Sequence, residues 1–204
     1  MIAVLTGDII NSRKAKSTKE WNNLLRESLS KIAENDSDWE IFRGDSFQVE
    51  LKDAPSALKK SLYLKASLKT IKGLDIRISI GAGEKSFTGK RITESYGEAY
   101  FFSGEQFELL KKNKQTLSVR TTNDTFDEDF NLFFRLALTF IDNWTPNSAM
   151  LVRTFFDNET LSQRELGEIL GISQSSVSER FNRAYLTEIK DLINLFEKRL
   201  TSIL

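Results

Sequence analysis

The sequence of 204 residues predicts an α+β protein in which a sheet-and-helix part is followed by an all-helical part. Strand-like and helix-like patterns alternate up to residue 122, which is typical of a sheet covered by helices. Beyond residue 123 the apolar residues recur at helical spacing. An acidic stretch at 124–129 separates the two parts, so we expect the domain boundary there.

The sequence contains neither histidine nor cysteine, and this excludes several kinds of site. Ser-His-Asp triads, thiolate nucleophiles, zinc fingers, iron–sulfur clusters and disulfides all require one of these residues. A bound metal ion must therefore be held by oxygen atoms, which select hard cations such as Mg²⁺, Mn²⁺ or Ca²⁺.

The apolar stretches are too short for a membrane span. The longest, from Leu132 to Ile141, has ten residues and contains Arg135, whereas a span needs about 20. The N-terminal segment has no basic region and no small-residue cleavage site. We therefore expect a cytoplasmic protein without a membrane partner.

The first two elements are expected to be a strand and a helix. Residues 2–6 form a short apolar run without alternation, as in a strand that is covered on both faces. Ser17 and Glu20 have the spacing of a capping box, and the apolar residues that follow recur at helical spacing up to Ala33.

A hairpin and a second helix are expected next. The strand-like runs 39–42 and 47–51 flank the turn-type cluster Arg43-Gly44-Asp45-Ser46, which predicts a hairpin with Asp45 at its tip. A helix should then begin near Pro55 and end at Gly73.

The remaining elements of this part complete a known arrangement. Residues 74–82 alternate as a half-buried strand, Ser103 and Gln106 predict the cap of a short helix, and 116–120 predict a last strand. The leading order of strand, helix, hairpin, helix and strand is that of the ferredoxin-like fold.

The chain is therefore divided into three predicted segments. Residues 1–122 form a ferredoxin-like domain with 21 basic and 16 acidic side chains (+5). Residues 123–148 form an aromatic-rich connecting helix with 1 basic and 5 acidic side chains (−4). Residues 149–204 form a helix-turn-helix domain with 7 basic and 8 acidic side chains (−1).

The most specific motif is a helix-turn-helix pattern that runs from Leu161 to Arg180. Ser162 and Glu165 predict a capping box for its first helix. Gly171 lies where the turn needs a positive φ. The residues predicted to form the shared core of the two helices are Leu166, Leu170, Ile172 and Val177.

The second helix of this motif is expected to contact double-stranded DNA, through base edges or phosphates. The expected contact residues are Gln174, Ser175, Ser178, Arg180, Asn182 and Arg183. A helical hairpin that binds nothing is the alternative.

The charge of −1 is weak for DNA binding, because phosphate neutralisation supplies much of the affinity. A single copy should therefore bind poorly, and a homodimer would double the contacts. An apolar stripe on the last helix could form the dimer interface or pack within its own chain. Its residues are Leu186, Ile189, Ile193, Phe196, Leu200 and Ile203.

Asp8 and Asp45 are candidate metal ligands in the first part of the chain. Asp8 is expected at the end of the first strand and Asp45 at the hairpin tip, and these elements are neighbours in a ferredoxin-like sheet. Two converging carboxylates form half of a Mg²⁺ or Mn²⁺ site, which substrate phosphates complete. Each aspartate alone is also typical of an ordinary turn.

Four short motifs in this part resemble the palm domain of class III nucleotidyl cyclases: Gly7-Asp8, Gly44-Asp45, 79–84 and 95–100. Together with the helix-turn-helix pattern, roughly residues 1–200 resemble the SatD family of small bacterial proteins, often described as regulators. The cyclase resemblance implies that Asp8 and Asp45 bind metal and that the backbone beside them binds a triphosphate. The nucleotide-binding residues expected are Gly7, Ile9, Ile10, Arg43 and Gly44.

The sequence departs from the cyclase pattern at two places that concern catalysis. Residues 100–109 contain neither the Asn nor the Arg that the pattern expects, and Ile41 and Phe42 occupy the place of a base-selecting lysine. Loss of a transition-state cation typically costs several kcal/mol, unless Arg13, Arg43 or Arg77 replaces it.

Two functions are consistent with these patterns. The first is a cytoplasmic DNA-binding regulator whose palm-like domain senses a nucleotide with a divalent cation. The alternative is a metal-dependent nucleotidyl cyclase or nucleotidyltransferase whose helical domain mediates assembly. A scaffold in which both sites are silent is a third, weaker option.

Overall fold

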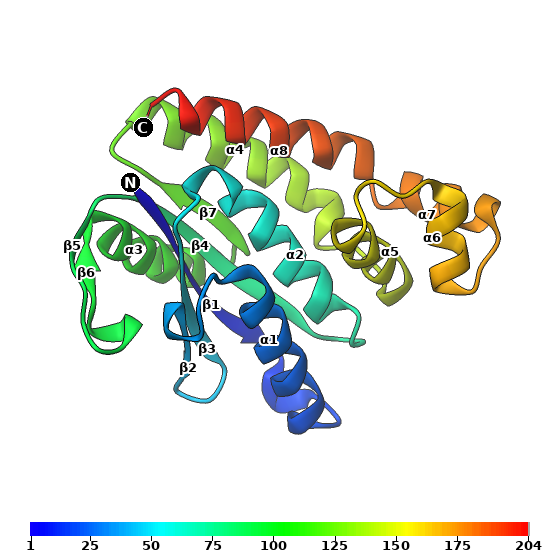
Figure 1. The fold of residues 1–204 in the computed structure, drawn as a ribbon, viewed down its shortest axis with the longest axis horizontal. Coiled ribbons are helices and arrows are strands. Elements are labelled where there is room, and N and C mark those ends of the chain that lie inside the picture. The colour runs from blue at the N-terminus through cyan, green and yellow to red at the C-terminus, as the bar shows by residue number, and fades with distance from the viewer. Residues whose placement is uncertain (204) are drawn as a thin grey trace.

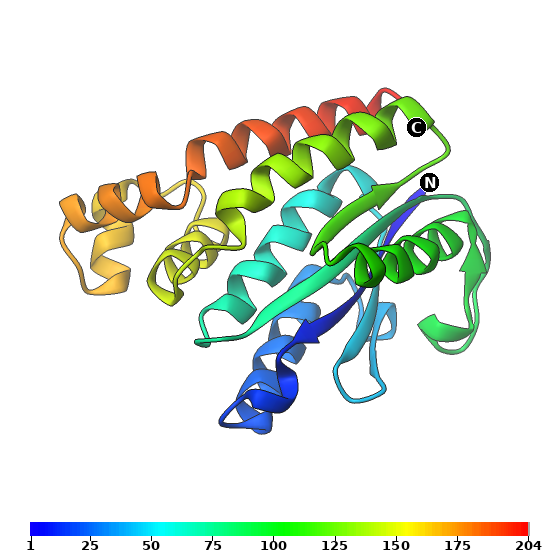
Figure 2. The same ribbon diagram turned by 180° about the vertical axis from the view of Figure 1, so that it is seen from behind.

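A computed structural model describes residues 1–203 as an α+β fold with helices on both faces of one main sheet (Figures 1 and 2). Residue 204, the last of the predicted segment 149–204, lies outside the described residues. Helices α1 and α2 pack on one face of the sheet and α3 packs on the other. The α-helices are α1 (Thr18–Ile32), α2 (Ala57–Lys69), α3 (Glu98–Asn113), α4 (Asp124–Ile141), α5 (Pro146–Asp157), α6 (Gln163–Leu170), α7 (Gln174–Arg183) and α8 (Leu186–Thr201). Within the described residues, no helix combines the length and the apolar character that crossing a membrane requires.

The main sheet has the strand order β2-β3-β1-β4-β7. Strand β1 is antiparallel to both of its neighbours, β2 is antiparallel to β3, and β7 is parallel to β4. The strands are β1 (Ile2–Ile10), β2 (Trp39–Phe42), β3 (Ser46–Leu51), β4 (Asp75–Gly83) and β7 (Leu117–Arg120). A separate two-stranded ribbon consists of β5 (Lys85–Phe87) and β6 (Tyr96–Gly97), which the sequence patterns did not predict.

Strand β1 is longer than the strand predicted at 2–6. Residues 7–10 continue the ladder with β4, in which Asp8 lies opposite Arg77. Ile9 is buried on the same face as Ala3 and Leu5, so this face stays apolar to the end of the strand. The prediction that Asp8 ends the strand was therefore wrong, because pairing with β4 extends beyond the apolar run.

Helix α3 begins at Glu98, five residues before the predicted cap at Ser103. Ser103 is fully buried within the helix. Its hydroxyl lies 3.0 Å from Oγ1 of Thr6, and its carbonyl accepts a hydrogen bond from Ser79. The predicted cap was wrong because this hydroxyl bonds to the sheet and to its own helix instead of capping a helix end.

Helix α5 is an element that the sequence patterns did not predict. The Thr145 side chain caps it by accepting a hydrogen bond from the backbone N–H of Ser148, and Pro146 occupies its first turn. The helix packs against α2, which places it between the sheet part and the two helices that follow.

One apolar cluster extends through the sheet and helices α1, α2, α4, α5 and α8. Phe196 of α8 packs against Phe126, Phe130 and Phe134 of α4, with ring centroids between 5.0 and 6.0 Å apart. The cluster contains residues from all three predicted segments, so no gap in the core marks either boundary. The division into three segments stays a prediction from sequence.

The apolar stripe of α8 is part of this core. Its residues Leu186, Ile189, Ile193, Phe196 and Leu200 are buried, and α8 packs on α2 and α4. The stripe therefore packs within its own chain and is not free to pair with a second copy.

Candidate functional site

Helices α6 and α7 form a compact pair at one end of the molecule (Figure 1). Ser162 and Glu165 form a complete capping box at the start of α6, and the hydrogen bonds from Ser162 lower the pKa of Glu165. Gly171 ends α6 with φ 65°, in the left-handed region that favours glycine. Ser173 then caps α7 by accepting a hydrogen bond from the N–H of Ser176.

The two helices share a small apolar core. Leu166 of α6 and Val177 of α7 are buried. A Cβ atom on Gly167 would lie 2.7 Å from the carbonyl oxygen of Ile172, so only glycine allows the turn to pack this closely on α6. The close packing fixes the angle at which α7 leaves the turn.

Helix α5 connects this pair to the rest of the chain. The rings of Phe155 on α5 and Phe181 on α7 meet edge to face, with centroids 5.9 Å apart. After α7, the carbonyl of Ala184 accepts a hydrogen bond from the Trp144 indole at 3.1 Å. Helix α7 is thus held on one side and open to solvent on the other.

The predicted DNA-contact residues do not all share one side of α7. Gln174, Ser178 and Asn182 are four residues apart and lie in one row, with Ser175 beside them. Arg180 follows the buried Val177 by three residues, so it lies on the opposite flank. Arg183 follows Ser175 by eight residues, in the row that also contains Glu179, and so adjoins this group. Of the six residues, Arg180 is the one that the structure places apart.

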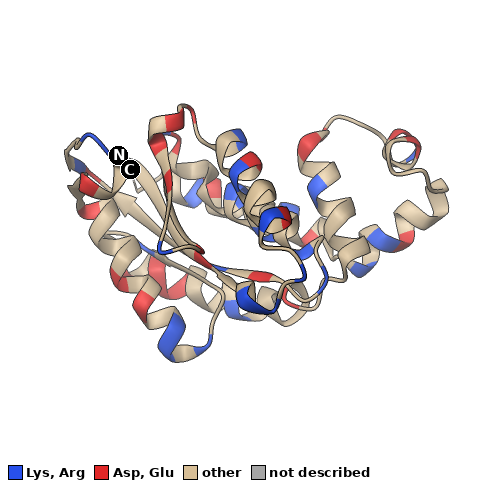
Figure 3. Ribbon diagram, turned by 90° about the horizontal axis from the view of Figure 1, so that it is seen from below, with Lys and Arg blue, Asp and Glu red and all other residues tan. Residues whose placement is uncertain are grey.

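Hydrogen bonds and ion pairs restrain three of the predicted residues. Gln174 donates to the side chain of Gln163 at 2.9 Å, and the hydroxyls of Ser175 and Ser173 are 2.9 Å apart. Arg183 forms an ion pair with Glu179 at 2.5 Å. Acidic and basic residues are mixed at this end of the molecule (Figure 3).

Asp8 and Asp45 have neighbouring backbones. Ser46, the residue after Asp45, lies opposite Asp8 in the ladder of β1 and β3. The N–H of Ile9 donates to the carbonyl of Asp45 at 3.1 Å. The hairpin turn that contains Asp45 uses Gly44 at φ 91°. Pairing of β1 with the hairpin therefore brings the two residues to the same end of the sheet, as expected.

The two carboxylates have different partners. Asp8 accepts two hydrogen bonds from Arg77, at 3.0 and 3.3 Å, on the same side of β1 as Thr6, which contacts α3. Asp45 accepts a hydrogen bond from Ser12. Among residues 1–203, no three Asp or Glu side chains gather in a geometry that would hold a metal ion. A metal site shared by Asp8 and Asp45 stays a prediction.

A hollow of about 240 Å³ lies beside the hairpin. The indole N–H of Trp21, which is buried on α1, has no hydrogen-bond partner in the described part of the chain. Arg13 and Arg43 form no ion pair with any carboxylate of residues 1–203. The residues that line the hollow are Ser12, Arg13, Thr18, Trp21, Arg43, Gly44 and Asp45. The Ser12 hydroxyl already donates to Asp45, but the two arginines, the Thr18 hydroxyl and the Trp21 indole N–H can all donate to an anion such as phosphate.

The family of the chain follows from comparison with known proteins. A family model described as the SatD family matches residues 1–191. The chain belongs to the SatD family. The same comparisons found no match among curated proteins or solved structures.

The match to the SatD family covers the sheet, the hollow, α6 and α7, and it ends within α8. Of the nucleotide-binding residues predicted for this SatD-family protein, Arg43 and Gly44 line the hollow. Gly7 and Ile9 do not, because Gly7 lies against the Phe47 ring and Ile9 is in the apolar core. Ile10 lies at the end of β1 and is likewise outside the lining.

The sequence patterns missed several residues of these sites. Ser12, Thr18 and Trp21 were not assigned to the sheet edge; Ser12 follows β1 directly, whereas Thr18 and Trp21 belong to α1. Gln163 was not assigned to the α7 surface, although it opens the helix that precedes the turn. For Ser12 and Gln163, closeness along the chain to Asp8 and to Ser162 was the available signal.

Proposed function

We propose that this SatD-family protein is a DNA-binding regulator in which α6 and α7 form a helix-turn-helix and α7 enters the major groove. The observation that carries the proposal is the glycine turn at Gly171, which packs α7 on α6 and leaves the row of Gln174, Ser178 and Asn182 exposed or half-exposed. Amide side chains in such a row can bond adenine edges in both directions.

The mixed charge of this surface implies a weak phosphate contribution to affinity. Arg183 is paired with Glu179, and Arg164 is paired with Glu168. Neutralised arginines release fewer counterions from DNA. We therefore propose that a homodimer binds DNA and that each copy contacts one half-site. The two copies would associate through a surface other than the buried stripe of α8.

Selection from a random double-stranded DNA library, followed by fluorescence anisotropy with the full chain, tests DNA binding. Asn182→Ala and Gln174→Ala are expected to weaken binding to the selected site by about tenfold each. Thr187→Ala, exposed on α8, is the matched control and should leave affinity unchanged. If the wild-type chain binds no DNA at low salt, this function is ruled out.

The proposal extends to the sheet, whose elements from β1 to β4 we assign to a ferredoxin-like, palm-like domain that senses a nucleotide. The support is the hollow, where Arg13, Arg43 and the Trp21 indole offer donors without partners. Asp45 would hold Mg²⁺ or Mn²⁺ together with phosphate oxygens, since Mg²⁺ often binds through one carboxylate and a substrate. Quenching of Trp21 fluorescence by a nucleoside triphosphate, lost in Arg43→Ala, is the expected result.

A metal-dependent nucleotidyl cyclase or nucleotidyltransferase has less support. Asp8 is bound by Arg77, so neither residue is free for a triphosphate. Incubation with each nucleoside triphosphate and Mg²⁺ or Mn²⁺ should yield no product. A product that disappears in Asp8→Ala would favour the enzyme over the sensor.

A further inference from the structure

A second cavity lies on the other side of α1 and α2 from the sheet. It has a volume of about 330 Å³, which is within the range of small-molecule sites. Its walls come from the end of α1, the segment just before α2, the first half of α2 and the end of α5. The lining residues are Lys31, Ile32, Asp53, Ser56, Lys59, Lys60, Tyr63, Phe156 and Asp157.

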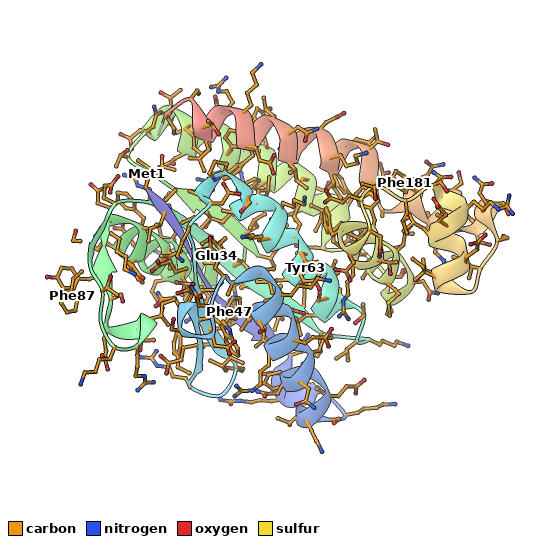
Figure 4. The ribbon with its side chains drawn as sticks, viewed as in Figure 1. Met1, Glu34, Phe47, Tyr63, Phe87 and Phe181 are labelled. Atoms are coloured by element: carbon orange, nitrogen blue, oxygen red, sulfur yellow. The ribbon has the colours of Figure 1, made fainter. Side chains whose placement is uncertain are left out.

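Tyr63 of α2 contributes a buried hydroxyl group to the cavity (Figure 4 labels the residue). Its side chain is only 5% exposed, and its hydroxyl makes no hydrogen bond within residues 1–203. Buried hydroxyl groups nearly always find a partner, because leaving one unpaired costs free energy. The Tyr63 hydroxyl can therefore form a hydrogen bond with an atom of a ligand.

Lys60 contributes a cation without an ion pair. It lies three residues before Tyr63, on the same side of α2. Lys31 is paired with Asp157 and Lys59 with Glu159, whereas Lys60 has no carboxylate within ion-pair distance in the described part of the chain. Burial lowers the pKa of Lys60.

Only one of the three lysines that line the cavity is available to an anion. Lys31 and Lys59 are paired with Asp157 and Glu159, which leaves Lys60 as the cation without an ion pair. The remaining walls are Ile32, Phe156 and the Tyr63 ring, which offer apolar contact. A small molecule with one negative group and an apolar body matches both properties.

We propose that this cavity binds a small organic anion, a carboxylate or a phosphate monoester, with Lys60 as its counter-ion and the Tyr63 hydroxyl as a hydrogen-bond donor. The Lys31 ammonium lies 5.6 Å from the centre of the Tyr63 ring and bonds Asp157 at 2.5 Å. Because Lys31 also lines the cavity beside Tyr63, an anion bound there competes with Asp157 for Lys31.

The site lies between the two candidate functional regions. Lys60 and Tyr63 belong to α2, which packs on the sheet, whereas Phe156 and Asp157 belong to α5, which packs on α7. A bound anion would therefore contact both α2 and α5. Binding at this cavity does not depend on the proposed DNA contacts, so it is measured without DNA.

The test uses NMR of the full chain labelled with ¹³C in its tyrosine rings, in a phosphate-free buffer. The chain has four tyrosines, so Tyr63→Phe assigns the Tyr63 signal directly. Inorganic phosphate and benzoate are titrated separately as probes. We expect a saturable shift of the Tyr63 signal with at least one probe, and which probe succeeds identifies the head group.

Three variants make the test specific. Lys60→Met should weaken the affinity for the probe by about tenfold, and Lys60→Arg should retain it. Asp157→Asn should tighten it, because the competing carboxylate is removed. Lys112→Met, exposed on α3, is the matched control and should match wild type. If neither probe shifts the Tyr63 signal, or if Lys112→Met weakens binding as much as Lys60→Met does, the proposal is wrong.

Discussion

Asn131 of α4 makes both backbone hydrogen bonds of Val119 in β7. Its side-chain oxygen accepts from the Val119 N–H at 2.9 Å, and its side-chain amide donates to the Val119 carbonyl at 2.8 Å. Strand β7 is the last strand of the sheet, so these groups would otherwise have no partner on that side. A single side chain therefore replaces a sixth strand at this position, and α4 closes the sheet edge.

Replacing Asn131 with leucine should destabilise the chain by about 2–4 kcal/mol, because two part-buried backbone groups lose their partner. The free energy of unfolding in urea measures the effect. Asn113→Leu, exposed at the end of α3, is the control and should change stability by less than about 0.5 kcal/mol. Equal stability of the two variants would contradict the role of Asn131.

Asp127, also on α4, should make stability depend on pH. Burial raises its pKa from 3.8 to about 6, against the hydrogen bonds from Thr121, which lower it. A raised pKa means that the folded chain holds the proton more tightly than the unfolded chain does. The contribution of Asp127 to stability is therefore present at low pH and is lost as pH rises from 3.8 to about 6.

The measurement compares wild type with Asp127→Asn in urea between pH 4 and pH 8. The free energy of unfolding of wild type should fall relative to that of the variant up to about pH 6 and then run parallel to it. The other carboxylates are common to both proteins, so their titration, ordinarily at about pH 4, cancels in the difference, and the absence of histidine removes the groups that usually titrate at about pH 6 to 7. A difference that is independent of pH would show that the Asp127 pKa is not raised.

An ionic network around two buried lysines connects α2, β4 and the end of α4. Lys65 is only 2% exposed and lies 2.8 Å from carboxylate oxygens of both Asp75 and Asp142. Lys69 bonds Asp75 at 3.1 Å and the Asp142 carbonyl at 2.7 Å. Removing the Asp75 charge takes from the buried Lys69 its carboxylate partner and leaves Lys65 with Asp142 alone.

Asp75→Asn should therefore destabilise the chain by about 3–5 kcal/mol. Glu168→Gln removes half of an exposed pair with Arg164 on α6 and should cost at most about 1 kcal/mol. Thermal unfolding followed by circular dichroism compares the two variants. If Asp75→Asn unfolds at the same temperature as Glu168→Gln, the network does not stabilise the fold.

Local patterns in the sequence predicted the first residue of a helix correctly where the capping residue is close in sequence to the N–H group that it bonds. Helices α1 and α6 begin where Ser17 and Ser162 predicted, because each hydroxyl bonds an N–H only three residues away. The start of α3 was misplaced, since Ser103 bonds to a strand almost a hundred residues away. Long-range hydrogen bonds leave no local signal.

The candidate sites show the same difference. The backbones of Asp8 and Asp45 are neighbours, as predicted, because the pairing of β1 with β3 fixes their positions. Which group each carboxylate bonds depends on side chains from β4 and from the turn after β1, and no spacing in the sequence encodes Arg77 or Ser12 as those partners.

Two glycines within helices provide the sharpest test of the α6 and α7 geometry. A Cβ atom on Gly167 would approach the Ile172 carbonyl at 2.7 Å, whereas a Cβ atom on Gly104 of α3 would meet nothing within 4 Å. Gly167→Ala should therefore cost about 1–3 kcal/mol through overpacking. Gly104→Ala should stabilise the chain by up to about 1 kcal/mol, because alanine favours the helix. Hydrogen exchange should locate the loss of protection in α6 and α7 for Gly167→Ala alone. If both variants change stability in the same direction, then α6 and the turn are not packed as closely as the structure shows, and the proposed orientation of α7 loses its basis.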